Sequence, residues 1–355
     1  MLKIIKEKIA TGQRINDAEA LYLFKIPLPT LGKLATQVKQ RFHPESVTTF
    51  VIDININLTN VCECECKFCA FYVRSGDKKT FTLTADEVLK KLEPLIKLGG
   101  TQVLLQGGLN PKLKLDYYTQ LLKTIKQHYP QLYIHSFSPP EIDYLAEQEN
   151  LSSKSILKIL GEAGLDSLPG GGAEILVDRV RQAISPKKIS RDRWLQIMRE
   201  AHQLGMKSTA TMMFGSVETL PERIEHLQVI RQLQDETGGF RAFIPWTFSP
   251  DNTQLADITM AGGGEYLRML AISRIYLDNI PHIGSGWVTE GMKIAQLGLL
   301  NGADDMGGIL MEEKVLESTG MKNQTNIAEL IAVIKDAGFT PAQRNTEYEI
   351  MELFK

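Results

Sequence analysis

Four cysteines lie within eight positions of this 355-residue chain, in the stretch CECECKFC from 62 to 69, and the chain has no others. In a reducing compartment, clustered cysteines are more typical of metal binding or redox chemistry than of structural disulfides. Cys62, Cys66 and Cys69 are spaced Cys-x3-Cys-x2-Cys. A short loop with this spacing can supply three thiolates to a 4Fe-4S cluster, which leaves the fourth iron without a protein ligand. Such an iron can bind another molecule, as the open position of a catalytic zinc ion binds water.

A structural zinc site that uses all four cysteines, including Cys64, is the alternative. Structural zinc usually takes two separated pairs of ligands, which reach tetrahedral corners without strain. This chain has one tight run of cysteines, and its six histidines are dispersed. The pattern therefore favours the cluster, with no ligand role for Cys64.

The segment before the cysteines, VIDININL from 51 to 58, alternates apolar and polar residues. Its isoleucines and leucine would form one face of a strand, and the other face would carry Asp53, Asn55, Asn57 and Thr59. The packed interior of a barrel would prefer Val, Ile or Leu, so polar inward residues predict a wet cavity that holds a ligand. An edge strand with a solvated face is the alternative.

The elements that must position these residues follow a regular succession. Apolar, β-branched segments begin near 51, 101, 131, 166, 207, 240, 282 and 304, with amphipathic helical stretches between them. The first of these stretches opens with a capping box of Thr84 and Glu87 and closes on Gly99 and Gly100. Eight strand-helix units without hairpin turns predict an α/β fold, a (β/α)8 TIM-type barrel. A doubly wound open sheet is the rival.

Two segments flank this succession. Residues 1–45 are predicted to form an N-terminal helical extension outside a barrel domain of residues 46–355, and residues 326–339 are predicted to be the last barrel helix. In a barrel, the cysteines after the first strand would lie at the C-terminal mouth, where barrel enzymes place their chemistry.

Composition excludes several classes of partner. Hydrophobic residues are 43% and charged residues 23% of the chain, as in globular proteins with a sizeable core, and the formal net charge is −2. We therefore expect no nucleic-acid partner and no membrane partner. The first residues lack the apolar core of a signal peptide, so we expect a cytoplasmic location.

The cysteine spacing after the first strand, with Phe68 just before the last cysteine, resembles the radical S-adenosylmethionine (SAM) superfamily. The resemblance implies that Cys62, Cys66 and Cys69 hold a 4Fe-4S cluster whose open iron chelates SAM. An electron then cleaves SAM to methionine and a 5′-deoxyadenosyl radical that abstracts hydrogen. The resemblance also implies a set of SAM-binding residues: Phe68, Tyr72, Gln106, Gly107, Gly108, Ser136, Gly215 and Glu218.

Two further motifs are similar to segments of that superfamily. LLQGGLN, from 104 to 110, resembles the glycine-rich turn that approaches the methionine amino group, but Leu109 stands where an acid is usual, and Gln106 is expected to supply the polar contact. TATMMFGSVE, from 209 to 218, resembles the strand that lies along the adenine. The alternatives are an ordinary glycine turn and an ordinary core strand.

Closer similarity covers almost the entire chain. CKFCAFY, IHSFSPPEI, AGLDSLPGGGAEIL, FRAFIPWTFSPDNT and GWVTEG resemble the menaquinone futalosine-pathway branch, and most closely its cyclic dehypoxanthine futalosine synthases. Aminofutalosine synthases and the deazaflavin FO synthase subunit share much of this pattern and are the alternatives. The implied reaction is a ring closure: hydrogen leaves C4′ of the ribose, the carbon radical adds to the attached benzoate ring, and a proton and an electron leave. The expected partners are dehypoxanthine futalosine and an external one-electron reductant such as flavodoxin or ferredoxin; the sequence gives no oligomeric state.

Several residues are expected at the mouth for this chemistry. His135, Glu141 and Glu174 are candidate general bases. The alternatives are a hydrogen-bonded structural histidine and, for Glu174, an acid in the first turn of a helix. Candidates for binding the substrate carboxylate are Ser136, Arg241, Thr247 and Thr289, and Trp246 and Trp287 are candidate cavity walls. A cluster- or zinc-bearing carrier or structural protein is the alternative that is not an enzyme.

Overall fold

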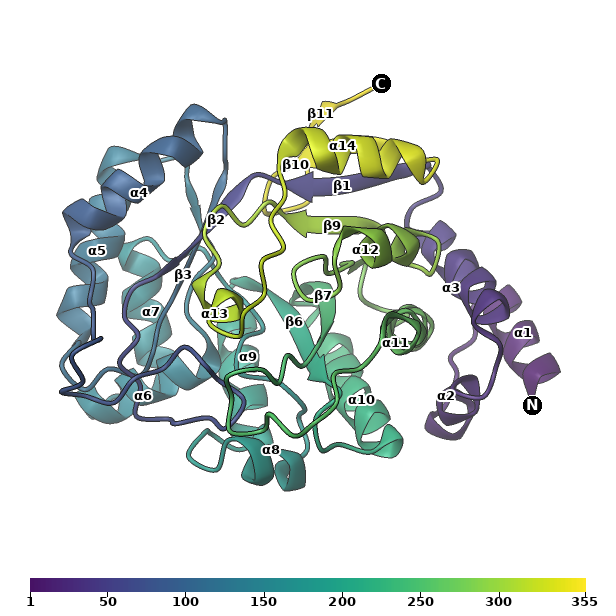
Figure 1. Cartoon of the computed structure of the whole chain (residues 1–355), viewed down its shortest axis with the longest axis horizontal. Helices are drawn as coiled ribbons and strands as arrows, with labels where there is room; N and C mark the ends of the chain where they lie inside the picture. The colour runs from purple at the N-terminus through teal and green to yellow at the C-terminus, as the bar shows by residue number, and fades with distance from the viewer.

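The computed structural model describes residues 1–355 as a ring of parallel strands surrounded by helices (Figure 1). In chain order the strands of the ring are β1 (Val47–Val51), β2 (Asp53–Asn57), β3 (Gln102–Gln106), β4 (Tyr133–Ile134), β5 (Ser167–Leu168), β6 (Lys207–Phe214), β7 (Phe240–Thr247), β8 (His282–Ile283) and β9 (Asp305–Gly308). All eight predicted strand positions are occupied. Those of β4, β5 and β8 are only two residues long, which is shorter than expected.

The ring is closed. Only Ile52 separates β1 from β2, and the two act as one strand: β1 pairs with β9, and β2 pairs with β3 along its whole length. The bridges His135↔Ser167 and Gly284↔Asp305 join β4 to β5 and β8 to β9. With β1 and β2 counted as one, eight parallel strands form a (β/α)8 barrel, and the open-sheet alternative is wrong.

The helices outside the ring are α4 (Ala85–Lys97), α5 (Leu115–His128), α6 (Pro139–Glu149), α7 (Ser153–Ala163), α8 (Asp178–Ile184), α9 (Arg191–Gln203), α10 (Leu220–Thr237), α11 (Gly263–Tyr276), α12 (Met292–Leu299) and α14 (Ile327–Asp336). The predicted capping box of α4 is present, because the Thr84 hydroxyl accepts the Glu87 N–H and the Glu87 carboxylate accepts the Thr84 N–H. Each of β4 and β5 is followed by two helices, α6 and α7 after β4 and α8 and α9 after β5, whereas the strand-helix pattern predicted one after each strand.

The first 45 residues are helical, as predicted: α1 (Leu2–Thr11), α2 (Asp17–Leu23) and α3 (Leu28–Phe42). Helix α3 packs along α11, and α2 packs against α10, so the extension lies outside the barrel wall (Figure 1). The division of the chain into domains at residue 45 stays a prediction.

The end of the chain holds two strands that the sequence did not predict. After α14, β10 (Thr340–Arg344) pairs in parallel with β1, and β11 (Ile350–Leu353) pairs antiparallel with β10. Strand β10 uses the same edge of the β1–β2 strand as β3, but at its N-terminal half. The last barrel helix predicted at residues 326–339 is present as α14, and these two strands follow it.

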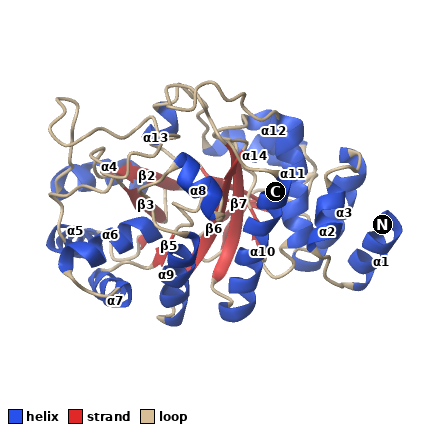
Figure 2. Cartoon of the chain, turned by 90° about the horizontal axis from the view of Figure 1, so that it is seen from below, coloured by secondary structure: helices blue, strands red, loops and turns tan.

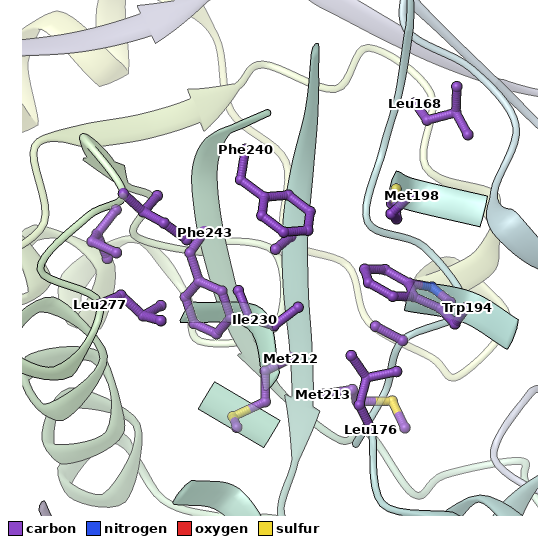
Figure 3. Packing of buried hydrophobic residues seen from close by; sticks show 14 of the residues in the cluster. Leu168, Leu176, Trp194, Met198, Met212, Met213, Ile230, Phe240, Phe243 and Leu277 are labelled. Carbon is purple, nitrogen blue, oxygen red and sulfur yellow. The ribbon is translucent and has the colours of Figure 1, made fainter. Parts of the chain in front are cut away.

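Aromatic and sulfur-containing side chains fill the space between the barrel wall and the outer helices (Figure 3). Trp194 of α9 is fully buried, and its ring lies against Phe240 of β7 with centroids 6.4 Å apart. Its indole N–H donates to the carbonyl of Gly171, 3.1 Å away. One buried side chain thus contributes to the hydrophobic core and also fixes the loop after β5.

None of the helices combines the length and apolar character that crossing a bilayer would require.

Candidate active site

A cavity of about 510 Å³ lies inside the barrel and reaches its C-terminal end. Figure 2 shows that loops gather at one end of the strands, beside α13 (Lys314–Glu317). Asp53, Asn55 and Asn57 of β2 line this cavity, while Ile52, Ile54 and Ile56 are buried in the core. The predicted polar interior is confirmed, and the edge-strand alternative is wrong. The volume is within the range of about 300–1,000 Å³ that is typical of small-molecule sites.

Backbone hydrogen bonds fix the cysteine loop at the mouth of this cavity. The Cys62 N–H donates to the carbonyl of Val73 at 3.1 Å, and the Lys67 N–H donates to that of Ile184 at 2.8 Å. The carbonyl of Lys67 accepts the Gln254 N–H at 2.9 Å. All four cysteines line the cavity, and none forms a disulfide.

The glycine turn after β3 packs directly on the cysteine loop. A Cβ atom at Gly108 would lie 2.1 Å from the carbonyl oxygen of Val61 and 2.7 Å from Cβ of Cys62. No other residue fits there without moving the loop that carries the first cysteine. Gly107 and Gly108 therefore form a cradle for that loop.

The chemistry of the donors indicates what the cysteine loop can hold. Structural zinc usually takes two separated pairs of ligands, whereas all four cysteines here lie in one short loop. The donor set, three thiolates of a short loop with the predicted spacing, fits an iron-sulfur cluster better than zinc.

Cys64 and Cys66 are close neighbours, with their sulfur atoms 3.5 Å apart. This hydrogen bond raises the pKa of Cys64 and lowers the pKa of Cys66, and the Lys188 ammonium favours the Cys66 thiolate further. Burial raises the pKa of the Cys62 and Cys69 thiols. Cys66 is therefore the thiol of this loop that ionises most readily.

Lys188 is a site residue that the sequence analysis missed. Its ammonium lies 3.0 Å from the Glu174 carboxylate and 5.0 Å from the centre of the Phe68 ring. Burial alone would lower the pKa of Lys188, but the charges of Cys66 and Glu174 raise it above its ordinary value. Nothing in the sequence distinguishes it from its neighbour Lys187, which is exposed.

Glu174 lies in the loop after β5 and lines the cavity. It has a left-handed backbone with φ of 42°, and α8 begins only at Asp178. The alternative that Glu174 is an acid in the first turn of that helix is therefore wrong. Its carboxylate instead compensates the buried charge of Lys188, and Arg181 lies 3.9 Å from its other oxygen.

Glu141 comes from α6, yet it contacts the glycine turn. One carboxylate oxygen accepts the Gly107 N–H at 3.2 Å, and the other accepts the Ser138 hydroxyl at 2.6 Å. Burial raises the pKa of Glu141 to about 7, and these hydrogen bonds oppose the shift only in part. An acid from another element therefore lies beside the glycine turn, although Leu109 of the turn is not acidic.

His135 lines the cavity as expected, and its Nδ1 lies 2.6 Å from the Ser167 hydroxyl oxygen. Burial, with smaller contributions from Arg241 and Arg344, lowers its pKa well below the ordinary value, so the ring is neutral.

Asp53 is a second acid that was not predicted as a base. Its carboxylate accepts the N–H of Leu310 at 2.9 Å and the side-chain amide of Gln102 at 3.2 Å. Burial raises its pKa to about 7. A Cβ atom at Gly308 would lie about 2 Å from this carboxylate, so that glycine provides the space for Asp53.

Three residues predicted to bind SAM do not reach the cavity. Ser136 is fully buried, and its hydroxyl accepts the Leu105 N–H at 2.9 Å. The Glu218 carboxylate accepts the Gly215 N–H at 2.6 Å and pairs with Arg223 at 2.9 Å. Ser136, Gly215 and Glu218 are absent from the cavity wall, whereas Phe68, Tyr72, Gln106, Gly107 and Gly108 belong to it.

The residues suggested for a substrate carboxylate either bind other groups or lie outside the cavity wall. The hydroxyls of Thr247 and Thr289 both donate to the Glu290 carboxylate, at 2.5 and 3.0 Å. Arg241 contacts the Tyr133 hydroxyl and, like Ser136, does not line the cavity. Trp246 and Trp287 do form part of the cavity wall, as expected.

Comparisons with known proteins agree with this geometry. Residues 56–230 match the Radical SAM superfamily, and residues 237–355 match the family described as CofH/MqnC C-terminal region. The chain is 46% identical to the cyclic dehypoxanthine futalosine synthase of Streptomyces coelicolor, over 98% of this chain and 88% of that protein. It is 43% identical to the synthase of the same name from Halalkalibacterium halodurans, over 99% and 95% of the two chains.

More distant similarity extends to other activities. The aminodeoxyfutalosine synthase of Thermus thermophilus is 39% identical over 97% of this chain and 94% of its own length. Among solved structures, methylornithine synthase superposes with a TM-score of 0.76 at 18% identity, over 95% of this chain and 97% of that one. The similarity to methylornithine synthase shows a shared fold alone.

Proposed function

Since the chain belongs to the radical SAM superfamily, in the family of the cyclic dehypoxanthine futalosine synthases, we propose that it converts dehypoxanthine futalosine to its cyclic form in menaquinone biosynthesis. The superfamily uses a 4Fe-4S cluster and SAM, which together supply a 5′-deoxyadenosyl radical. In the overall reaction C4′ of the ribose loses hydrogen and bonds to the benzoate ring, and the ring then loses a proton and an electron. The observation that carries the proposal is that the Cys-x3-Cys-x2-Cys loop lines a cavity of about 510 Å³ inside the barrel, together with the polar residues of β2.

Cys62, Cys66 and Cys69 are proposed to hold the cluster. The cradle at Gly108 keeps Cys62 in place, and Lys188 compensates thiolate charge beside Cys66. Phe68, Tyr72 and Gln106, which line the cavity next to this loop, are proposed to contact SAM.

Proton removal from the ring requires a base inside the cavity. Asp53 and Glu141 have a pKa near 7, which suits a group that accepts a proton near neutral pH. His135 has a lowered pKa and is a weaker base. Glu174 is already paired with Lys188. We therefore rank Asp53 and Glu141 before the two other acid-base candidates.

The cavity also protects reactive species. Trp246 and Trp287 form apolar wall, and the indole N–H of Trp287 donates to the Gly308 carbonyl at 3.0 Å, which fixes its ring. A rigid wall excludes water and stray hydrogen donors and holds the two reacting carbons in place.

The reductant is proposed to be a small electron carrier such as flavodoxin or ferredoxin, and the location to be the cytoplasm. Anaerobic assays with SAM and a reductant test the substrate. Dehypoxanthine futalosine should be converted to its cyclic product, whereas the carboxyvinyloxy-benzoate taken by aminofutalosine synthases should not. Turnover of the second compound alone would assign the chain to the second activity.

A further inference from the structure

Two buried amide oxygens on β2 have no hydrogen-bond partner in the protein. They are Oδ1 of Asn55 and Oδ1 of Asn57. The side chains are 3% and 5% exposed, and both line the cavity. Leaving such an acceptor unpaired costs free energy, so a buried polar group of this kind is expected to meet a donor when the site is filled.

The orientation of Asn55 is fixed by the segment that follows β9. Its side-chain N–H donates to one carboxylate oxygen of Glu313 at 2.5 Å. The other oxygen of Glu313 accepts the N–H groups of Val315 and Leu316, which caps α13. Helix α13 lies across the barrel opening (Figure 1). The amide group of Asn55 is thus held with its oxygen free.

The surrounding charge limits what can bind there. Asp53 and Glu313 flank Asn55 on the strand and on the covering segment. An anionic group such as a carboxylate would face the acids Asp53 and Glu313 and the two amide oxygens, so it is disfavoured there. A neutral donor meets no such repulsion. Hydroxyl groups have the required chemistry, since each donates one hydrogen bond and tolerates acids nearby.

We propose that Asn55 and Asn57 bind two hydroxyl groups of the sugar ring of the substrate, an inference that rests on the proposed function. Residues two apart on a strand point to the same side, so both side chains face the same part of the cavity and can reach neighbouring hydroxyls of one sugar. The benzoate end of the substrate then faces the aromatic side chains of the cavity wall, Trp246 and Trp287.

SAM also carries a ribose, so two molecules have hydroxyls of the required kind: SAM and the substrate. Strand β2 runs toward the cysteine loop, and Asn55 lies two residues, or about 7 Å, further from that loop than Asn57. SAM binds at the loop in this superfamily. The deeper position of Asn55 assigns the pair to the substrate.

Asn57→Leu is the cleanest test, because the Asn57 side chain makes no hydrogen bond within the protein whereas leucine has nearly the same shape. We expect an unchanged or raised melting temperature, together with at least a tenfold rise in KM for dehypoxanthine futalosine. An analogue that lacks the sugar hydroxyl bound by Asn57 should bind the variant about as well as the intact substrate does, because the variant has already lost that hydrogen bond. SAM affinity should stay at the wild-type level.

Asn279→Leu is the matched control. Asn279 also has an unpartnered Oδ1, but it lies outside the cavity, where its amide N–H binds Arg231 and Asp235. This variant should lose stability and keep the wild-type KM. If Asn57→Leu left KM unchanged while wild-type protein formed the cyclic product, the inference would be wrong and the proposed function would stand. A loss of SAM affinity instead would assign the hydroxyls to the SAM ribose and overturn it. A wild-type protein that forms no cyclic product would refute the proposed function first.

Discussion

The carboxylate of Glu141, on α6, accepts the backbone N–H of Gly107, in the turn after β3, at 3.2 Å. Residues 34 positions apart in the sequence thus place an acid beside the glycine turn that supports the cysteine loop. Both ends of the carboxylate are hydrogen-bonded inside the protein, and the cavity lies next to it. The contact joins the turn beneath the cysteine loop to the helix that follows β4.

Glu141→Gln should change how stability depends on pH. Burial raises the pKa of Glu141 from its ordinary 4.5 to about 7, so the folded chain binds this proton more tightly than the unfolded chain. The stabilisation that comes from protonated Glu141 is therefore complete below about pH 4.5 and is lost as the pH rises through about 7. The difference is on the order of 3 kcal/mol, since one pKa unit corresponds to about 1.4 kcal/mol. Urea unfolding at pH 5 and pH 8 measures it, and the variant should lose less stability between the two. An identical loss in both proteins would mean that Glu141 ionises normally.

Lys188→Met should destabilise the protein strongly. Lys188 and Glu174 are 10% and 8% exposed, and removing the cation leaves the buried carboxylate with only the more distant Arg181, at a cost of up to about 3–5 kcal/mol. Lys187→Met is the control, because Lys187 pairs with Glu65 at the surface, where the pair contributes at most about 1 kcal/mol. Denaturant unfolding of both variants compares the two losses. Equal losses would refute the role of Lys188 as a buried counter-charge.

Gly108→Ala should impair the loading of the cluster. The new methyl group would overlap the carbonyl of Val61 and Cβ of Cys62, so the loop with the first cysteine must move. In Gly264→Ala the added methyl group meets open space at the start of α11, and that variant should be as stable as the wild type or slightly more so. Iron and sulfide content after anaerobic reconstitution tests the pair. Full loading of Gly108→Ala would show that the cradle is not needed.

Cys64→Ser and Cys66→Ser should differ in their effect, although the two sulfurs are only 3.5 Å apart. Cys66 belongs to the Cys-x3-Cys-x2-Cys set, and Cys64 does not. We expect Cys64→Ser to keep most of its cluster and activity and Cys66→Ser to lose both. The absorbance of the cluster and the formation of 5′-deoxyadenosine report the difference. If the two variants lost them equally, the assignment of ligands would be wrong.

The strands of the barrel could be predicted because each is a short apolar or alternating run, and the alternation of Ile54 and Asn55 also predicted which face lines the cavity. Strands β10 and β11 were missed. TPAQR and IMEL carry no alternation, and β10 depends on pairing with β1, nearly 300 residues earlier. Such pairing is a tertiary effect that local pattern does not contain.

Some residues of the site could likewise be predicted from the sequence, and others could not. The cysteines were visible because three ligands lie in one short loop. Lys188, Glu313 and the contact of Glu141 with Gly107 were not visible, because each depends on elements that only the closed barrel brings together. Asp53 was recognised as an inward polar residue, but its raised pKa follows from the surroundings that Gly308 and Leu310 create.

The most direct test of the account is the formation of 5′-deoxyadenosine by the anaerobically reconstituted protein in the presence of SAM and a reductant. Dehypoxanthine futalosine should increase this formation and yield one cyclic product in proportion to it. A chain that binds zinc but no iron and leaves SAM intact, with or without dehypoxanthine futalosine, would contradict the account.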